Sequence, residues 1–105
     1  MTLTDFDKFL CREMKACKDL MMIKNADYAT DDDKLANFKL AGKIDGIGAR
    51  FALYGMDLKH RASINQGLED TAYTKEHTLS WWQEKIRDHI NYMFLLLALI
   101  EEGTE

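Results

Sequence analysis

Apolar residues recur at steps of three and four along most of the chain, which is the spacing of amphipathic helices. The first such stretch follows Thr4, a residue type that caps helices, with Asp5 and Asp7 in the first turn. Its apolar positions are Phe6, Phe9, Leu10, Met14, Cys17, Leu20 and Met21. A first helix is therefore expected from Thr4 to about Lys24.

Three further helices are predicted from the same spacing. They are expected from the cap cluster Asp31–Asp33 to about Ala41, over about Ala49–Gln66, and from Thr78 or Ser80 to about Glu102. Gly67 is expected to end the third helix. The glycines of AGKIDGIGA, at 42, 46 and 48, predict a hinge or a tight interhelical turn. They do not form a phosphate loop, because the segment lacks the G-K-[S/T] ending and no strand precedes it.

Composition favours a single all-α domain over residues 1–105. The 105 residues include no proline, and the net charge is −4 without a basic run, which disfavours binding to duplex nucleic acid. The run Met93–Ile100 is too short for a membrane span, which needs about 20 residues. Because this run is apolar all round, we expect it to be buried between subunits of a homodimer or higher homo-oligomer. No signal peptide is seen at the N-terminus, so a cytoplasmic location is expected.

The two cysteines are expected to be reduced thiols. Cys11 and Cys17 stand six positions apart in one predicted helix and point to different faces. They show no zinc-site spacing with the three histidines.

A polar stripe on the fourth predicted helix indicates metal chemistry. Glu84, Asp88 and Asn91 follow one another at i, i+4 and i+7, which places all three side chains on one helix face. Carboxylate and amide oxygens suit Mg²⁺, a cation commonly shared with substrate phosphates. The alternative is a solvated stripe with Lys85 and Arg87 beside it.

A second set of polar residues lies on the third predicted helix. Asp57 and Arg61 form an i,i+4 pair, with Arg50 on the same face. The pair is either an ordinary ion pair, or a metal ligand next to an arginine that binds phosphate. His89, on the fourth helix, is interpreted as a core histidine.

The third polar patch is K-N-A-D-Y at Lys24–Tyr28, followed by Asn37 and Phe38. A lysine and an aromatic ring suit a nucleotide, with the cation on phosphate and the ring against the base. The alternative is a helix C-terminus with a favourable lysine.

Taken in order, these patches resemble a known family. The stretches are KNADYA at 24–29, LANFKLA at 35–41, MDLKHRASI at 56–64 and EKIRDHINY at 84–92. Together they resemble the nucleotide-modification-associated domain family of bacteriophages, which is similar to the MazG-like all-α NTP pyrophosphatases. The resemblance covers about residues 9–100.

The resemblance implies a helical bundle of about four helices, assembled by oligomerisation, that cleaves a nucleoside triphosphate to monophosphate and pyrophosphate with Mg²⁺. A phage protein would act in the host cytoplasm. The implied catalytic residues are Asp57, Arg61, Glu84 and Asp88, and the implied metal ligands are Asp57, Glu84 and Asp88. The implied nucleotide-binding residues are Lys24, Asp27, Tyr28, Asn37, Lys59 and Asn91.

Two departures from the family pattern keep other functions open. Ser80 stands where a glutamate is usual, and Leu58 stands where a lysine is usual. One alternative is a nucleotide-binding protein without catalytic activity. The other is a small helical phage protein that acts through protein contacts, with Trp81, Trp82 and the run Tyr92–Ile100 as its contact surface.

Overall fold

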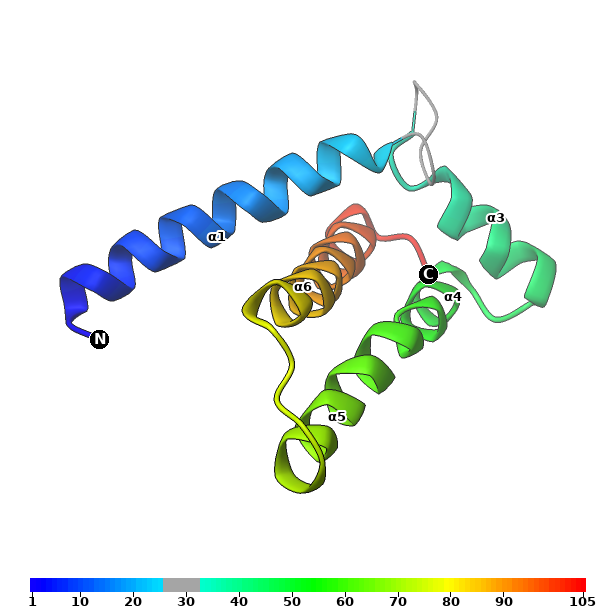
Figure 1. Ribbon diagram of the computed structural model, residues 1–105. Helices are drawn as coiled ribbons and strands as arrows, with labels where there is room; N and C mark the ends of the chain where they lie inside the picture. Colours follow the sequence, from blue (N-terminus) through cyan, green and yellow to red (C-terminus); the bar gives the residue numbers. More distant parts are fainter. Residues whose placement is uncertain (26–32) are drawn as a thin grey trace.

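The computed structural model describes residues 1–25 and 33–105, and these residues form helices and connecting segments without a strand (Figure 1). The helices are α1 (Leu3–Ile23), α3 (Ala36–Asp45), α4 (Ala49–Met56), α5 (Leu58–Tyr73) and α6 (Leu79–Glu102). The all-α prediction is therefore confirmed. Among the described helices, none combines the length and the apolar character that a membrane span requires.

Helix α1 begins two residues earlier than predicted. Thr2, rather than Thr4, is its capping residue: Thr2 Oγ1 accepts a hydrogen bond of 3.1 Å from the Asp5 backbone, and the Asp5 carboxylate accepts one of 3.4 Å from the Thr2 backbone. This reciprocal pair is a capping box. Thr4 stands at the same spacing from Asp7, so the sequence pattern did not distinguish the two starts.

The glycines between α3 and α4 form the tight interhelical turn that the sequence predicted. Gly46 and Gly48 have φ angles of 69° and 84°, in the region that favours glycine. Gly42, by contrast, lies inside α3, which continues to Asp45 instead of ending at Ala41. A Cβ at Gly42 would lie 2.3 Å from the backbone carbon of Gly48, so the glycine is needed for the close approach of helix and turn.

The third predicted helix is two helices, α4 and α5, which meet at Asp57. Gly67 does not end it, because α5 continues to Tyr73. The absent side chain of Gly67 makes room for two indole rings of α6, since a Cβ there would lie 2.6 Å from Trp81 and 2.8 Å from Trp82. Close packing at Gly67 thus outweighs its weak helix propensity.

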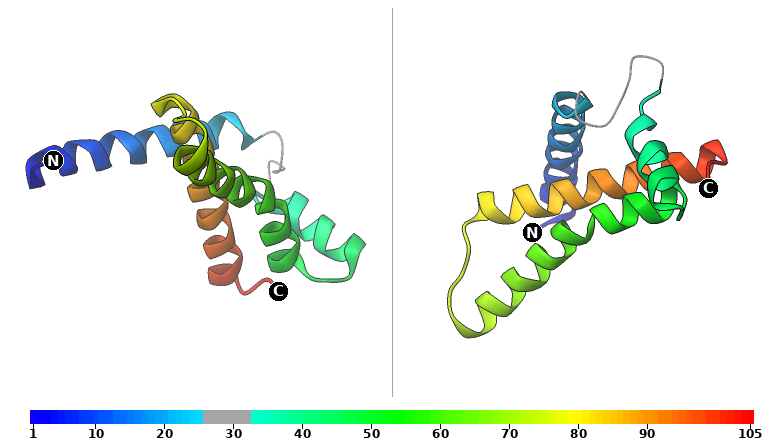
Figure 2. Two further views of the ribbon diagram at one scale, coloured as in Figure 1. Left: turned by 60° about the horizontal axis from the view of Figure 1, so that its bottom comes forward. Right: turned by 90° about the vertical axis from the view of Figure 1, so that its right-hand side faces the viewer.

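Helix α6 is the central element of the fold, and its cap at Thr78 confirms the predicted start. It contacts α1, α4 and α5, while α3 packs on α4 (Figures 1 and 2). The buried apolar core lies between α3, α4 and the C-terminal half of α6. Its members are Leu35, Phe38, Ala49, Leu53, Leu95 and Leu99.

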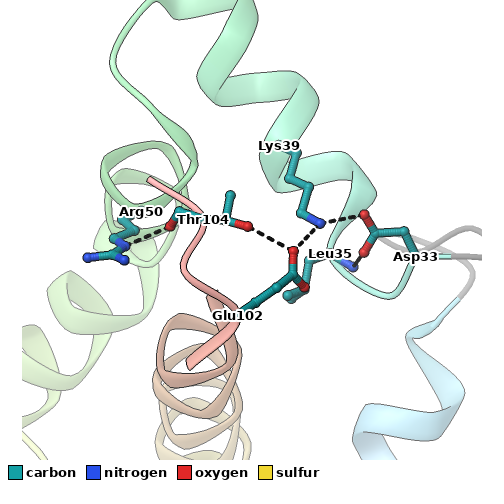
Figure 3. A network of polar contacts seen from close by, with 6 residues as sticks. All are labelled: Asp33, Leu35, Lys39, Arg50, Glu102 and Thr104. Carbon is teal, nitrogen blue, oxygen red and sulfur yellow. Dashed lines mark hydrogen bonds and ion pairs between the residues drawn. The ribbon is translucent and has the colours of Figure 1, made fainter. Parts of the chain in front are cut away.

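Hydrogen bonds and ion pairs join the C-terminal segment to α3 and α4 (Figure 3). Arg50 Nε donates to the carbonyl oxygen of Thr104 at 2.7 Å, and the Arg50 backbone donates to the carbonyl oxygen of Glu105 at 3.1 Å. Lys39 pairs with Asp33 at 2.6 Å and also with Glu102. Asp33 additionally accepts from the Leu35 backbone at 2.9 Å, just before α3 begins. The network closes one end of the core.

Both cysteine thiols are free, as predicted. Cys11 is exposed, whereas Cys17 is buried against α6, and burial raises the pKa of its thiol.

Candidate functional site

Asp57, at the junction of α4 and α5, is the most deeply buried charged residue of the described chain, with no solvent-exposed surface. Its Oδ2 lies 2.7 Å from Nδ1 of His89 on α6 and 3.3 Å from Nε of Arg61. Arg61 also donates to the carbonyl oxygen of Tyr54 at 2.8 Å and stacks over the Tyr54 ring. Burial of a carboxylate requires partners of this kind. The i,i+4 ion pair of Asp57 and Arg61 is thus formed.

A second acid–histidine pair joins the same two helices, but here the acid comes from α6 and the histidine from α5. Asp88, on α6, faces His60 on α5, with Oδ2 of Asp88 3.9 Å from Nδ1 of His60. The other oxygen of Asp88 accepts a hydrogen bond of 2.9 Å from Lys24 Nζ, at the end of α1. In the first pair the acid, Asp57, is the N-cap residue of α5 and the histidine lies on α6. In the second pair the acid lies on α6 and the histidine on α5.

His60 and Tyr92 form the aromatic side of this arrangement. Their rings lie 4.9 Å apart, and Tyr92 also contacts Phe38 edge to face at 6.0 Å. Burial lowers the pKa of His60, although the nearby Asp88 opposes the effect. Burial raises the pKa of Tyr92. Both groups therefore stay neutral at pH 7, which suits them to hydrogen bonding and stacking.

A cavity of about 270 Å³ opens beside these residues. Its polar lining comes from the C-terminal end of α1 and from α3, α5 and α6, and its apolar lining consists of Phe38, Met56, Tyr92 and Leu95. The lining residues are Lys24, Asn37, Phe38, Met56, Lys59, His60, Asp88, Asn91, Tyr92 and Leu95. A concave site of mixed apolar walls and a few polar groups is typical of small-molecule binding.

The cavity gathers five of the residues expected to bind nucleotide or to act in catalysis: Lys24, Asn37, Lys59, Asp88 and Asn91. Asn91 is also structural, because its amide donates a 3.0 Å hydrogen bond to the carbonyl oxygen of Cys17 and joins α1 to α6. Asp27 and Tyr28 lie outside the described residues.

The electrostatic balance of the cavity favours an anion. Two lysines face one carboxylate, and His60 is neutral at pH 7 because burial lowers its pKa. Lys24 is already paired with Asp88. In the described part of the chain, the ammonium group of Lys59 has no hydrogen-bond or ion-pair partner, so it is available to a phosphate.

The other expected catalytic residues lie away from the cavity lining. Asp57 and Arg61 are behind it, engaged with His89 and Tyr54. Glu84 is exposed, with 66% of its side-chain surface accessible, and its nearest charged partner is Lys85 at 3.8 Å. The described chain therefore brings Asp57 and Asp88 to the same helix crossing but does not bring Glu84 to either.

The expected Mg²⁺ ligands do not fit a closed metal site within one chain. Among the described residues, no group of three His, Cys, Asp or Glu side chains is placed to hold a metal ion. Asp88 is neutralised by Lys24, and one oxygen of Asp57 is bound by His89. Asp57 Oδ1 is buried and has no hydrogen-bond partner among the described groups, so this one oxygen is available to a metal ion. A single carboxylate oxygen does not make up the set of ligands that Mg²⁺ requires.

Sequence reasoning missed the two histidines of this crossing. The spacing within the helices assigns no role to His60 and indicates a core position for His89. Their positions carried a signal: His60 is three residues after Asp57, on the same helix face, and His89 follows Asp88 directly. The pairing between the helices depends on how α5 crosses α6, which the spacing within either helix does not specify.

No protein-family model matches the chain, and no curated protein or solved structure shows significant similarity to it.

Proposed function

We propose that this protein binds a nucleotide in the cavity between α1, α3, α5 and α6. The observation that carries the proposal is the meeting of Lys24, Asn37, Lys59, Asp88 and Asn91 at one cavity, although they come from four separate stretches of the sequence. These residues belong to the motifs that resemble a nucleotide-handling family. A cavity shared by all four motifs supports a common ligand.

The lining suits the parts of a nucleotide. Lys59, and Lys24 after release from Asp88, would bind phosphate oxygens. The rings of Phe38 and Tyr92 provide an apolar wall for a base or sugar. The amides of Asn37 and Asn91 line the same cavity as polar groups that set orientation. The volume of about 270 Å³ is near the lower end of ligand sites, so the ligand is compact or partly exposed.

Cleavage of a phosphoanhydride bond, the activity that the resemblance implies, stays a prediction. It needs metal ligands, and the described residues of one chain do not assemble them. We therefore place binding first and make turnover a separate measurement.

Thermal unfolding of the full chain at fixed protein concentration tests the proposal. A panel of nucleoside and deoxynucleoside triphosphates, each with and without Mg²⁺, should contain a ligand that raises the midpoint by several degrees, since 100 times Kd adds about 2.7 kcal/mol. Sodium chloride at matched ionic strength should not do so. No response to any nucleotide would contradict the proposal.

Two lysine variants make the test specific. Lys59→Gln should remove most of the thermal shift, because it deletes the unpaired cation of the cavity lining. Lys75→Gln, in the connection after α5, is the matched control and should keep the shift. Chromatography of the same samples reads out pyrophosphate and monophosphate, and product formed only with Mg²⁺ would establish hydrolysis as well as binding.

A further inference from the structure

Helix α1 carries an apolar stripe that is only half covered. Phe6, Leu10, Met14, Cys17 and Met21 lie within about 80° of one another around the helix. Cys17 is buried against α6, and Met21 packs on the core. The N-terminal half of α1 extends past α6, as the left view of Figure 2 shows, and Met14 is 61% exposed. Within the described chain, α1 packs on no helix other than α6.

Helix α6 exposes a matching stripe beside it. Ile86, Ile90, Phe94 and Leu97 share one face, and Phe94 is 57% exposed. Between the two helices lies a groove of about 750 Å³, and its apolar floor includes Leu10, Met14, Met21, Ile90 and Phe94. An ion pair between Glu13 and Arg87, at 2.7 Å, joins the two helices beside this floor. An apolar centre with charged groups at its edge is the composition of protein interfaces.

The surface of the chain is too large for a compact monomer. Scaling with mass gives roughly 6,100 Å² for 12.2 kDa, about 1,300 Å² less than the 7410 Å² observed. The radius of gyration is 15.9 Å, against about 13 Å expected for a compact domain of this length. A standard interface buries about 800 Å² on each partner, so the excess is sufficient for one stable contact.

We propose that a second copy of this chain occupies the groove between α1 and α6, forming a two-fold dimer. The same patch on both copies would bury the uncovered half of the α1 stripe together with the exposed stripe of α6. Lys18 and the intrachain pairs Glu13–Arg87 and Lys15–Asp19 lie at the edge of the groove, so charges of both signs surround its apolar floor on each copy. This surface includes Phe94 and Leu97 of the apolar run Met93–Ile100, which the sequence predicted to lie between subunits. It does not include Trp81 and Trp82, the other part of the predicted contact surface, whose rings pack on Gly67 and His77.

Sedimentation equilibrium of the full chain between about 1 and 100 μM tests the proposal, since interfaces of standard size give micromolar or tighter dissociation constants. The expected particle has twice the 12.2 kDa mass of one chain. Met14→Glu and Phe94→Glu should each weaken dimerisation by about 100-fold or more, because each buries a charge at the centre of the interface. Both side chains are exposed in the single chain, so circular dichroism should show its helix content retained.

Ile44→Glu is the matched control, because Ile44 is an apolar residue on α3 that is 73% exposed and does not line the groove. It should leave the dimer intact. Asn91 is left unchanged, since it lines the nucleotide cavity as well as the groove. A monomer at every concentration would overturn the proposal, whether or not the groove takes up a peptide or a lipid. So would a dimer that Ile44→Glu disrupts and the two groove variants do not.

Discussion

Asp57 and His89 lie 32 positions apart in the chain, yet Oδ2 of Asp57 and Nδ1 of His89 are 2.7 Å apart between α5 and α6. A carboxylate oxygen accepts hydrogen bonds, so Nδ1 of His89 is the donor in this contact and the contact fixes the orientation of the ring. The neighbouring pair of His60 and Asp88 crosses in the other direction. The two pairs hold α5 against α6 where few apolar side chains are buried, and the second pair is part of the cavity wall.

Asp57→Ala is expected to lower the free energy of unfolding by about 2–4 kcal/mol, because it leaves His89 and Arg61 without their shared partner. Urea denaturation followed by circular dichroism measures the change. A double-mutant cycle of Asp57→Ala with His89→Ala should give a coupling energy above about 0.5 kcal/mol. The exposed pair of Lys15 and Asp19 is the control, and its cycle should give less than that.

The stability of the protein is expected to fall as the pH drops below about 6.5, the ordinary pKa of histidine. Burial lowers the pKa of His60 in the folded chain, so between that lowered value and about 6.5 the unfolded state binds more protons. The stability is fully present above about pH 6.5 and is lost as the pH falls through the folded pKa. His60→Gln should flatten this part of the profile, measured by urea midpoints at a series of pH values.

A second loss at lower pH should persist in His60→Gln. Hydrogen bonds to basic partners lower the pKa values of Glu13, Asp33, Asp70 and Glu102, so these groups stabilise the fold above their unfolded pKa values and lose that effect as they are protonated. If His60→Gln left the slope near pH 6 unchanged, the assignment of that slope to His60 would be wrong.

Gly67→Ala is expected to destabilise the protein by about 1–3 kcal/mol, because the new methyl group would overlap the rings of Trp81 and Trp82. Gly55→Ala is the matched comparison within α4. Nothing lies within 4 Å of its added Cβ, so it should stabilise the protein by up to about 1 kcal/mol through helix propensity. Thermal unfolding of both variants checks the pair, and equal signs would contradict the packing shown at Gly67.

Asp88→Asn is expected to strengthen nucleotide binding in the absence of Mg²⁺ by about 3- to 10-fold, because it removes the negative charge from the cavity and frees Lys24. Titration calorimetry with the nucleotide found in the panel measures the effect, which should shrink at high salt. This prediction rests on the proposed binding site. Weaker binding of the variant without Mg²⁺ would mean that Asp88 contacts the ligand favourably and would contradict the electrostatic account.

Several features of the site were predictable because they depend on local spacing. The Asp57–Arg61 pair follows from an i,i+4 step on one helix, and it is formed. The expectation that Lys24, Asn37, Lys59, Asp88 and Asn91 share a ligand came from motif resemblance, and the fold brings them to one cavity. The spacing groups Glu84 with Asp88 because both lie on one helix face, but the neighbouring helices cover Asp88 and leave Glu84 in solvent.

The sequence by itself determined the helices, since periodic apolar positions, an absence of proline and caps such as Thr78 act over a few residues. It also determined the tight turn at Gly46 and Gly48, where φ is positive. Only the tertiary structure decided that α5 runs through Gly67 and that Asp57 meets His89 of α6. These outcomes depend on which helices cross, at what height and on which face. Such contacts join residues far apart in the chain, and no spacing within one helix encodes them.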